Sequence, residues 1–303
     1  MLKLTPLLIA IALLGCEDKA DVSIGGGGND TGFTGGGPGG GPGGGPGGAW
    51  SEEDWCGDMA DLSDLAADYD PANLRDTILA ISERRYPPAI AFIDVQADSY
   101  LDAWFGGSDQ SFDAVMSRYE VAVHEGSHIW DFENFNGSRW PYRVVDDDLI
   151  IETAYLNNFY RSAILDRHPY PNDDFYADTY LTGQSGSQGF NTLLDEYNAY
   201  AHSLASRYCI RDQFSGSTSA RDGILTMMLY VELYLQIARE DHPDDYDAIL
   251  ADADTVDMIL SVWERAEYWL DITADDNSLG IDDDYIEGFV YDPAYYAEIQ
   301  ALQ

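Results

Sequence analysis

The 303-residue sequence predicts a mainly α-helical (α+β) domain with one small β-hairpin. Three observations favour this fold class. Apolar residues recur at the three- and four-residue spacing of a helix in the longest segments. Capping residues, prolines and glycines stand where such segments begin and end. One pair of short segments, on either side of three consecutive aspartates, has the composition of antiparallel strands.

The N-terminal segment precedes this domain. An apolar stretch over residues 4–14 follows Lys3, is too short to remain as a membrane-spanning helix, and ends in Leu-Leu-Gly before Cys16. It resembles a bacterial lipoprotein signal, which implies that residues 1–15 are removed and that Cys16 carries a lipid. The alternative is an ordinary secretory signal with an incidental cysteine. The resemblance implies a location in the bacterial cell envelope, on the outer membrane or the cell surface, with membrane contact through this lipid only.

A glycine-rich segment follows the expected lipid anchor. Glycine dominates residues 25–48, and Pro38, Pro42 and Pro46 recur in it at a spacing of four. A segment of this composition buries too little apolar area to offset its conformational entropy. We therefore expect residues 16–49 to be the anchor and a disordered tether, and residues 50–303 to be the folded domain. About 250 residues are enough for one large domain or for two lobes around a cleft.

The helices and strands of the domain are expected in a definite order. Asp70 caps a helix that starts at Pro71 and runs to about Arg85, where two prolines stop it. Ser111 caps the next helix, over residues 112–132. A β-hairpin joins residues 142–145 and 149–151. Later helices are expected over residues 191–208, 223–239, 254–270 and 293–302.

The cysteines predict one disulfide. With Cys16 used by the lipid, Cys56 and Cys209 remain as an even pair in an oxidising compartment. A bond between them would join the start of the domain to its middle. The alternative is a pair of buried free thiols.

The charge of the chain is strongly acidic, with 55 Asp and Glu residues against 15 Lys and Arg residues. Nucleic acid is therefore not expected as a partner, because phosphate backbones require a basic surface. The only lysines, Lys3 and Lys19, precede the domain, which excludes a Schiff base or a P-loop within it. Bound calcium is unsupported, because the glycine and the final glutamate of the acidic segment 275–287 are out of register for an EF-hand.

The sequence His124-Glu125-Gly126-Ser127-His128 is an H-E-x-x-H motif. On a helix its two histidines lie about 40° apart, so both imidazoles can bind one metal ion. Glu125 is turned away from the histidine pair, where it can hold and deprotonate a water molecule. The motif predicts a hydrolytic centre with one zinc ion per chain. The alternative is a chance match on a surface helix.

A hydrolytic zinc ion needs a third protein ligand. The best candidate is Glu196, at the edge of an apolar helical stripe that includes Leu193 and Tyr197. The competing candidate is Glu152, 24 positions after His128, but the hairpin pattern puts it at the end of a strand. Either residue can instead be an ordinary solvated carboxylate.

Other polar residues are candidates for supporting roles. Tyr200, one helical turn after Glu196, is a candidate transition-state donor, although packing in the core is the stronger interpretation. Asp131 is a candidate for orienting a metal ligand. His202 is expected on the other side of its helix. His168 and His242 each precede a proline and are expected at the surface.

The segment from His124 to Asp131, with Glu196-Tyr197-Asn198-Ala199 some seventy residues later, resembles zinc metallopeptidases of the gluzincin group. The pattern is most similar to catalytic domains of the lethal-factor type. It covers about residues 110–210, and only the first motif is specific. The resemblance implies a zincin-like, two-lobed fold around the active-site helix. It also implies His124, His128 and Glu196 as zinc ligands, and Glu125 as general base. The chain lacks the third histidine of metzincins and the N-E-x-x-S-D of thermolysin-type enzymes.

The expected function is therefore that of a secreted, lipid-anchored zinc metallopeptidase acting on a peptide or protein. One alternative is a non-catalytic surface lipoprotein that uses its metal-binding helix for structure or interaction. A second is a zinc hydrolase with a non-peptide substrate. The sequence indicates neither a specificity pocket nor an oligomeric state.

Overall fold

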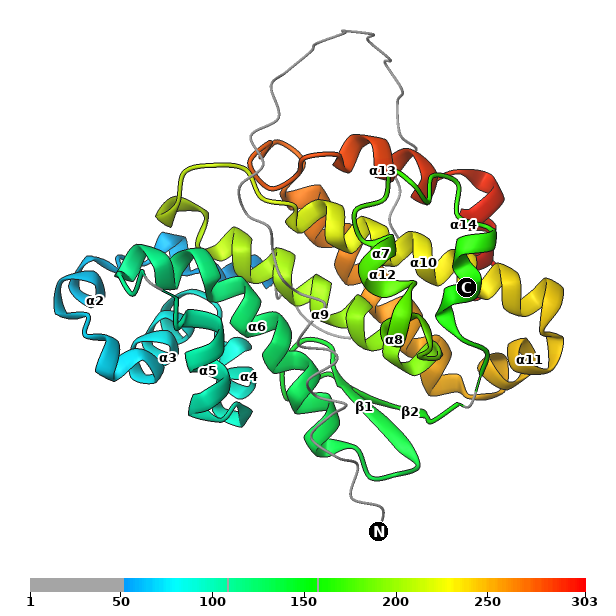
Figure 1. Ribbon diagram of the computed structural model, residues 1–303, viewed down its shortest axis with the longest axis horizontal. Coiled ribbons are helices and arrows are strands. Elements are labelled where there is room, and N and C mark those ends of the chain that lie inside the picture. Colours follow the sequence, from blue (N-terminus) through cyan, green and yellow to red (C-terminus); the bar gives the residue numbers. More distant parts are fainter. Residues whose placement is uncertain (1–51, 108, 157) are drawn as a thin grey trace, which may run out of the picture.

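The computed structural model describes residues 52–107, 109–156 and 158–303. The expected signal, the lipid site at Cys16 and the tether lie outside these residues. Helices predominate in the described part of the chain, and two strands form an antiparallel sheet (Figure 1). The prediction of a mainly helical fold with a small hairpin is confirmed. Among the described helices, none combines the length and the apolar character needed to cross a membrane.

The helices and strands follow one another with short connections. The first half consists of η1 (Glu52–Met59), α2 (Ser63–Asp68), η2 (Pro71–Asn73), α3 (Leu74–Arg85), α4 (Ala89–Val95), α5 (Asp98–Phe105), α6 (Phe112–Asn134), β1 (Arg139–Arg143) and β2 (Ile150–Ala154). The second half consists of η3 (Arg161–Asp166), α7 (Ala177–Tyr180), α8 (Gly183–Gly186), α9 (Phe190–Cys209), η4 (Arg211–Gln213), α10 (Ala220–Asp241), α11 (Pro243–Ala251), α12 (Ala253–Ile272), α13 (Asp283–Val290) and α14 (Pro293–Gln300).

The long helices agree with the sequence prediction. Helix α6 begins after Ser111, whose hydroxyl accepts a hydrogen bond from the amide of Ala114. Asp70 is an N-cap residue as expected, but the element that it caps is the short 3-10 helix η2. The α-helix starts only at Leu74. Helices α4, α5, α11 and α13 were not expected. At α4 the reason is visible, because Pro88, which was interpreted as the end of one helix, also precedes the next.

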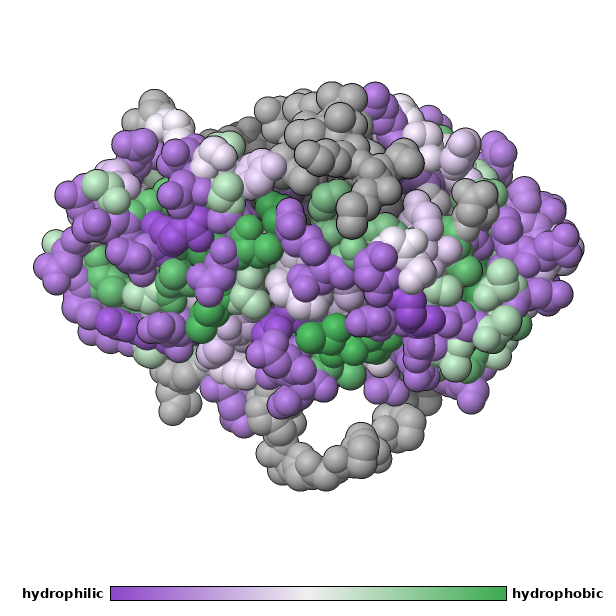
Figure 2. Space-filling view, turned by 90° about the horizontal axis from the view of Figure 1, so that it is seen from below, coloured by the Kyte–Doolittle hydropathy of each residue, from purple (hydrophilic) through white to green (hydrophobic). Residues whose placement is uncertain are grey.

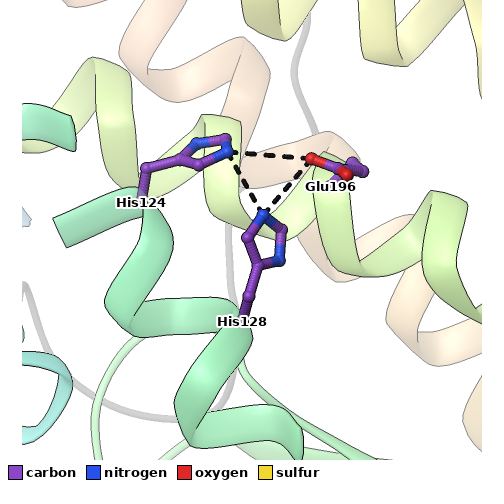
Figure 3. A group of neighbouring side chains, drawn as sticks. All are labelled: His124, His128 and Glu196. Atoms are coloured by element: carbon purple, nitrogen blue, oxygen red, sulfur yellow. Dashed lines mark hydrogen bonds and ion pairs between the residues drawn. The ribbon is translucent and has the colours of Figure 1, made fainter. Parts of the chain in front are cut away.

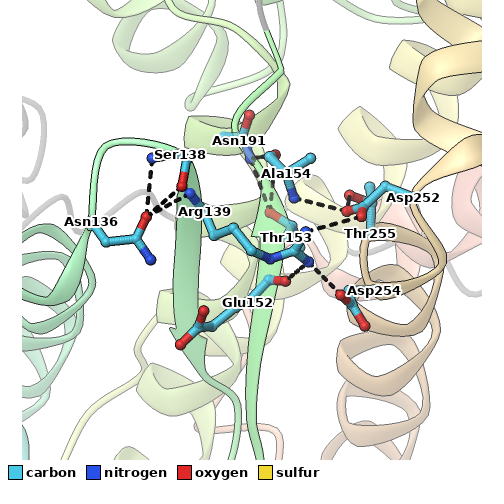
Figure 4. Close-up of polar contacts among 10 residues, drawn as sticks. All are labelled: Asn136, Ser138, Arg139, Glu152, Thr153, Ala154, Asn191, Asp252, Asp254 and Thr255. Carbon is cyan, nitrogen blue, oxygen red and sulfur yellow. Dashed lines mark hydrogen bonds and ion pairs between the residues drawn. The ribbon is translucent and has the colours of Figure 1, made fainter.

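The hairpin is present, but its strands are displaced from the predicted ranges. Strand β1 begins at Arg139 and pairs Tyr142 with Ile151. The side chain of Arg139 reaches Asp252 and Asp254 at the start of α12, and the Asp252 carboxylate also accepts from the amide of Ala154 (Figure 4). These partners are about a hundred positions away in the sequence, so a local pattern does not show where the strands begin.

Helix α9 is central to the described fold. It packs against α6 on one side and against α10 and α12 on the other, while α4 covers α6 (Figure 1). Of its 20 residues, from Phe190 to Cys209, nearly all are buried. A helix that is buried on several faces positions its polar residues inside the protein.

The predicted disulfide is present. Cys56 in η1 is bonded to Cys209 at the end of α9, with an S–S distance of 2.10 Å. Both cysteines are buried in the core. The bond fixes the end of α9 to the start of the described chain.

The prediction that His168 is a surface residue is wrong. Its side chain is completely buried, and its Nε2 lies 2.7 Å from Asp174 Oδ2. The hydroxyl of Tyr230, in α10, donates to the same oxygen. This polar cluster stabilises a buried imidazole, and its members come from separate segments. His242 is partly exposed and stacks on Phe159.

Candidate metal centre

The motif histidines lie on the buried face of α6. His124 and His128 are one helical turn apart, and both are almost completely buried. The glycine between them is required by packing, because a Cβ atom on Gly126 would lie 2.6 Å from the carbonyl oxygen of Phe92 in α4. Glycine therefore allows α4 to approach the turn that carries the two histidines closely.

Helix α9 places Glu196 opposite the two histidines (Figure 3). The Nε2 atoms of His124 and His128 are 3.2 Å apart. Glu196 Oε2 lies 3.3 Å from Nε2 of His128 and 3.7 Å from Nε2 of His124. In a tetrahedral zinc site with bonds of about 2.0–2.1 Å, ligand atoms are separated by about 3.3–3.4 Å. The three side chains therefore fit a zinc ion.

The outer nitrogen of each histidine also has a partner on α9. His124 Nδ1 lies 3.0 Å from the hydroxyl oxygen of Ser203. His128 Nδ1 lies 3.0 Å from Asp195 Oδ2. Such contacts fix the ring orientation, so that both Nε2 atoms face the centre. The sequence analysis did not identify Asp195 or Ser203. The available signal was the position of Ser203, which is two helical turns after Glu196 and hence on the same face.

The charges of the cluster are strongly coupled. Burial alone would lower the pKa of His128, but the carboxylates of Asp195 and Glu196 outweigh this effect and raise the pKa well above its usual value. Burial alone would raise the pKa of Glu196, but His128, His124 and Arg161 hold it below its usual range. These interactions therefore favour the protonated form of His128 and the ionised form of Glu196, and a metal ion would have to displace a proton from His128 in order to bind.

Asp131 lies one contact further from the centre. Burial, followed by the neighbouring carboxylate of Asp195, raises the pKa of Asp131 well above its usual value. Burial and the negative charge of Asp195 therefore both favour the protonated form of Asp131. Asp195 in turn lies beside His128.

Three other residues that the sequence singled out, Glu125, Glu152 and His202, have different surroundings. Glu125 is completely buried in α6. Glu152 is exposed on β2 and does not belong to the group that could hold a metal. His202 contacts the hydroxyl of Tyr86 and the carbonyl oxygen of Arg143 instead of the cluster. The sequence favoured Glu196 over Glu152, and the packing of α6 on α9 brings Glu196, and not Glu152, close to the two histidines.

Tyr200 is adjacent to the cluster. Its ring centroid is 4.7 Å from that of His124, and its hydroxyl lies 2.8 Å from the hydroxyl of Tyr180. A Cβ atom on Gly223 of α10 would lie 2.3 Å from this ring. The ring of Tyr200 is therefore fixed between α6 and α10.

The cluster has little exposure to solvent. The side chains of His124, His128 and Glu196 are 5%, 7% and 8% exposed. A cavity of about 380 Å³ lies elsewhere and is lined by other residues: Trp55, Pro87, Pro88, Arg143 and Asp146 to Asp148. The face seen in Figure 2 is mainly hydrophilic, with apolar side chains in separate patches.

Comparisons with family models, with curated protein sequences and with solved structures give no match for this chain. The interpretation of the cluster therefore depends on its own geometry and chemistry.

Proposed function

We propose that this chain is a zinc-dependent metallopeptidase whose metal is held by His124, His128 and Glu196. The convergence of two Nε2 atoms and one carboxylate oxygen within 3.7 Å carries this proposal. Two imidazoles and one carboxylate are a ligand set typical of catalytic zinc, which keeps its fourth position for water or substrate. The resemblance of the H-E-x-x-H segment, His124 to Asp131, to the motif of gluzincins is in line with the same assignment.

The residues of the chain then have separate roles. A bound zinc ion supplies Lewis-acid chemistry, which acidifies water and polarises a carbonyl group. Glu125 accepts a proton from the attacking water and later donates it to the leaving amine. Tyr200, next to His124, donates a hydrogen bond to the oxyanion that develops from the substrate carbonyl. We further propose that the protein is anchored to the bacterial envelope by a lipid on Cys16.

Metal analysis combined with one substitution tests this proposal. Protein without residues 1–48 and its Glu125→Gln variant are both expected to contain about one zinc ion per chain, as in catalytic sites with three protein ligands. Only the parent should cleave an unstructured protein such as casein. The variant should be slower by at least about 10²–10⁴-fold, the usual contribution of a general base. Equal rates would exclude Glu125 as the base, and absence of metal from both proteins would overturn the proposal.

One observation favours a second candidate, a metal-binding surface protein without catalytic activity. The three ligand side chains are only 5–8% exposed, whereas a peptidase must admit a peptide to its metal. This candidate predicts zinc in both proteins and casein cleavage by neither. The same experiment therefore distinguishes the two functions.

A further inference from the structure

A buried arginine lies behind the third metal ligand. Arg161 is the first residue of η3, and its side chain is completely buried. Its Nε donates to the carbonyl oxygen of Ser185 over 2.9 Å, and its Nη2 donates to the hydroxyl of the same residue. Its Nη1 donates to the carbonyl oxygen of Thr192. These contacts fix the guanidinium plane firmly.

The carboxylate that lies within ion-pair distance of Arg161 is that of Glu196. Nη2 lies 3.9 Å from Glu196 Oε1, and no other acidic side chain in the described part of the chain is within ion-pair distance of this guanidinium. This distance is too long for a hydrogen bond, so the interaction is one of charge. A buried guanidinium is costly without such a partner.

The two oxygens of Glu196 therefore have different surroundings. Oε2 lies 3.3 Å and 3.7 Å from the two histidine Nε2 atoms, whereas Oε1 is the oxygen nearest Arg161. A carboxylate that binds a metal through both oxygens occupies two coordination positions. In a zinc hydrolase this would compete with the position needed by water.

We propose that Arg161 is a positioning residue that keeps Oε1 of Glu196 away from the metal, so that Glu196 binds through Oε2 alone. The inference depends on the proposed metal site, but it does not depend on the identity of the substrate. It is distinct from a purely structural role, in which Arg161 only holds the segment of Ser185 and Thr192 in place. A structural role would affect stability and would leave the coordination of a bound metal unchanged.

Cobalt(II) in place of zinc distinguishes these two roles, because its visible absorption is strong in four-coordinate sites and weaker at higher coordination numbers. The full chain and its Arg161→Met variant are loaded with cobalt, and circular dichroism verifies folding. We expect the strong spectrum in the parent and a several-fold weaker one in the variant, since Oε1 is then free to bind. A folded variant with the parental spectrum would overturn the proposal.

Ser185→Ala is the matched control. It removes a hydroxyl acceptor of Arg161 but leaves the guanidinium and the Ser185 carbonyl in place, so the cobalt spectrum should not change. A Ser185→Ala spectrum that changes as much as that of Arg161→Met would assign the effect to loosened packing and overturn the proposal.

A measurement on the parent protein covers the case in which Arg161→Met does not fold. X-ray absorption at the zinc edge should then give four light ligands at about 2.0–2.1 Å. A five-ligand shell with both oxygens of Glu196 would overturn the inference without any variant. A chain that binds neither metal removes the proposed function and this inference together. A chain that binds metal but does not cleave casein removes only the peptidase, and the spectra still decide the role of Arg161.

Discussion

Two buried glutamates, Glu196 in α9 and Glu232 in α10, have contrasting surroundings. Toward α6, Glu196 faces two histidines whose outer nitrogens have partners of their own, and a buried arginine lies on its other side. In α10, the next helix on the other side of α9, Glu232 is completely buried, and neither of its carboxyl oxygens has a hydrogen-bond partner among the described residues.

The two environments shift the pKa values of the two glutamates in opposite directions. Neighbouring cations outweigh burial at Glu196 and keep its pKa below the usual range. At Glu232, burial, together with the charges of Glu298 and Asp292, raises the pKa to about 10. Burial of a carboxyl group alone therefore does not indicate a functional site. Partners that fix charge and orientation distinguish Glu196 from Glu232, and substitutions at both residues and at their neighbours test this distinction.

The largest effect is expected when the ligand itself is removed. Glu196→Ala should weaken zinc binding by more than about 100-fold, the upper range for loss of a supporting contact, because it removes one of three ligands. Glu152→Ala should leave the affinity unchanged, since Glu152 is exposed on β2. Competition with a chelator measures both. If Glu152→Ala loses zinc and Glu196→Ala retains it, the assignment of Glu196 as the third ligand is wrong.

The buried carboxyl group of Glu232 should destabilise the fold at neutral pH. In the folded protein the pKa of Glu232 is about 10, above the usual value of 4.5. The contribution of this residue to the free energy of unfolding is therefore fully present below about pH 4.5 and is lost as the pH rises toward 10. Glu232→Leu should remove this loss, which is on the order of 3 kcal/mol at pH 7. Urea unfolding between pH 5 and pH 9 measures the free energy of unfolding.

Glu264, an exposed residue of α12, provides the control for Glu232. Glu264→Gln should preserve the pH dependence of the parent. If Glu232→Leu has the same pH profile as the parent, or is less stable than the parent at pH 7, then Glu232 has a partner that stabilises its charge.

A smaller effect is expected from a supporting contact of the metal centre. Ser203→Ala removes the hydroxyl beside His124 Nδ1 and should lower zinc affinity by about 10–100-fold, the usual range for such contacts. Ser206→Ala is the matched control, because Ser206 is equally buried on the same helix but bonds to the backbone of Ser203. Equal zinc affinities for the two variants would show that Ser203 does not orient His124.

The sequence predicted those parts of the centre that depend on one helix at a time. The spacing of His124 and His128 follows from helical geometry, and the apolar stripe beside Glu196 indicated that it faces inward. The contacts between helices were not predictable in the same way. Asp195 and Ser203 are recognisable only once α9 is oriented against α6, and Arg161 belongs to an irregular turn without a periodic pattern.

The same limit explains the errors in the fold. The start of β1 depends on Arg139 and its contacts with the distant α12, so alternation over a few residues misplaced the strand. His168 was expected at the surface because a proline follows it. It is buried because Asp174 and Tyr230 provide a polar environment that only the tertiary fold assembles.

The disulfide has a consequence for the order in which the centre is assembled. Cys56 precedes both histidines and Cys209 follows Glu196, so all three ligands lie within a covalent ring that spans 153 positions. Closing a ring of this length restricts the unfolded chain by about 5 kcal/mol in chain-entropy estimates. An oxidised chain therefore begins folding with its ligand residues confined to a smaller volume. Oxidation before metal uptake therefore reduces the conformational entropy that is lost when the centre assembles, whereas a reduced chain loses this entropy during folding.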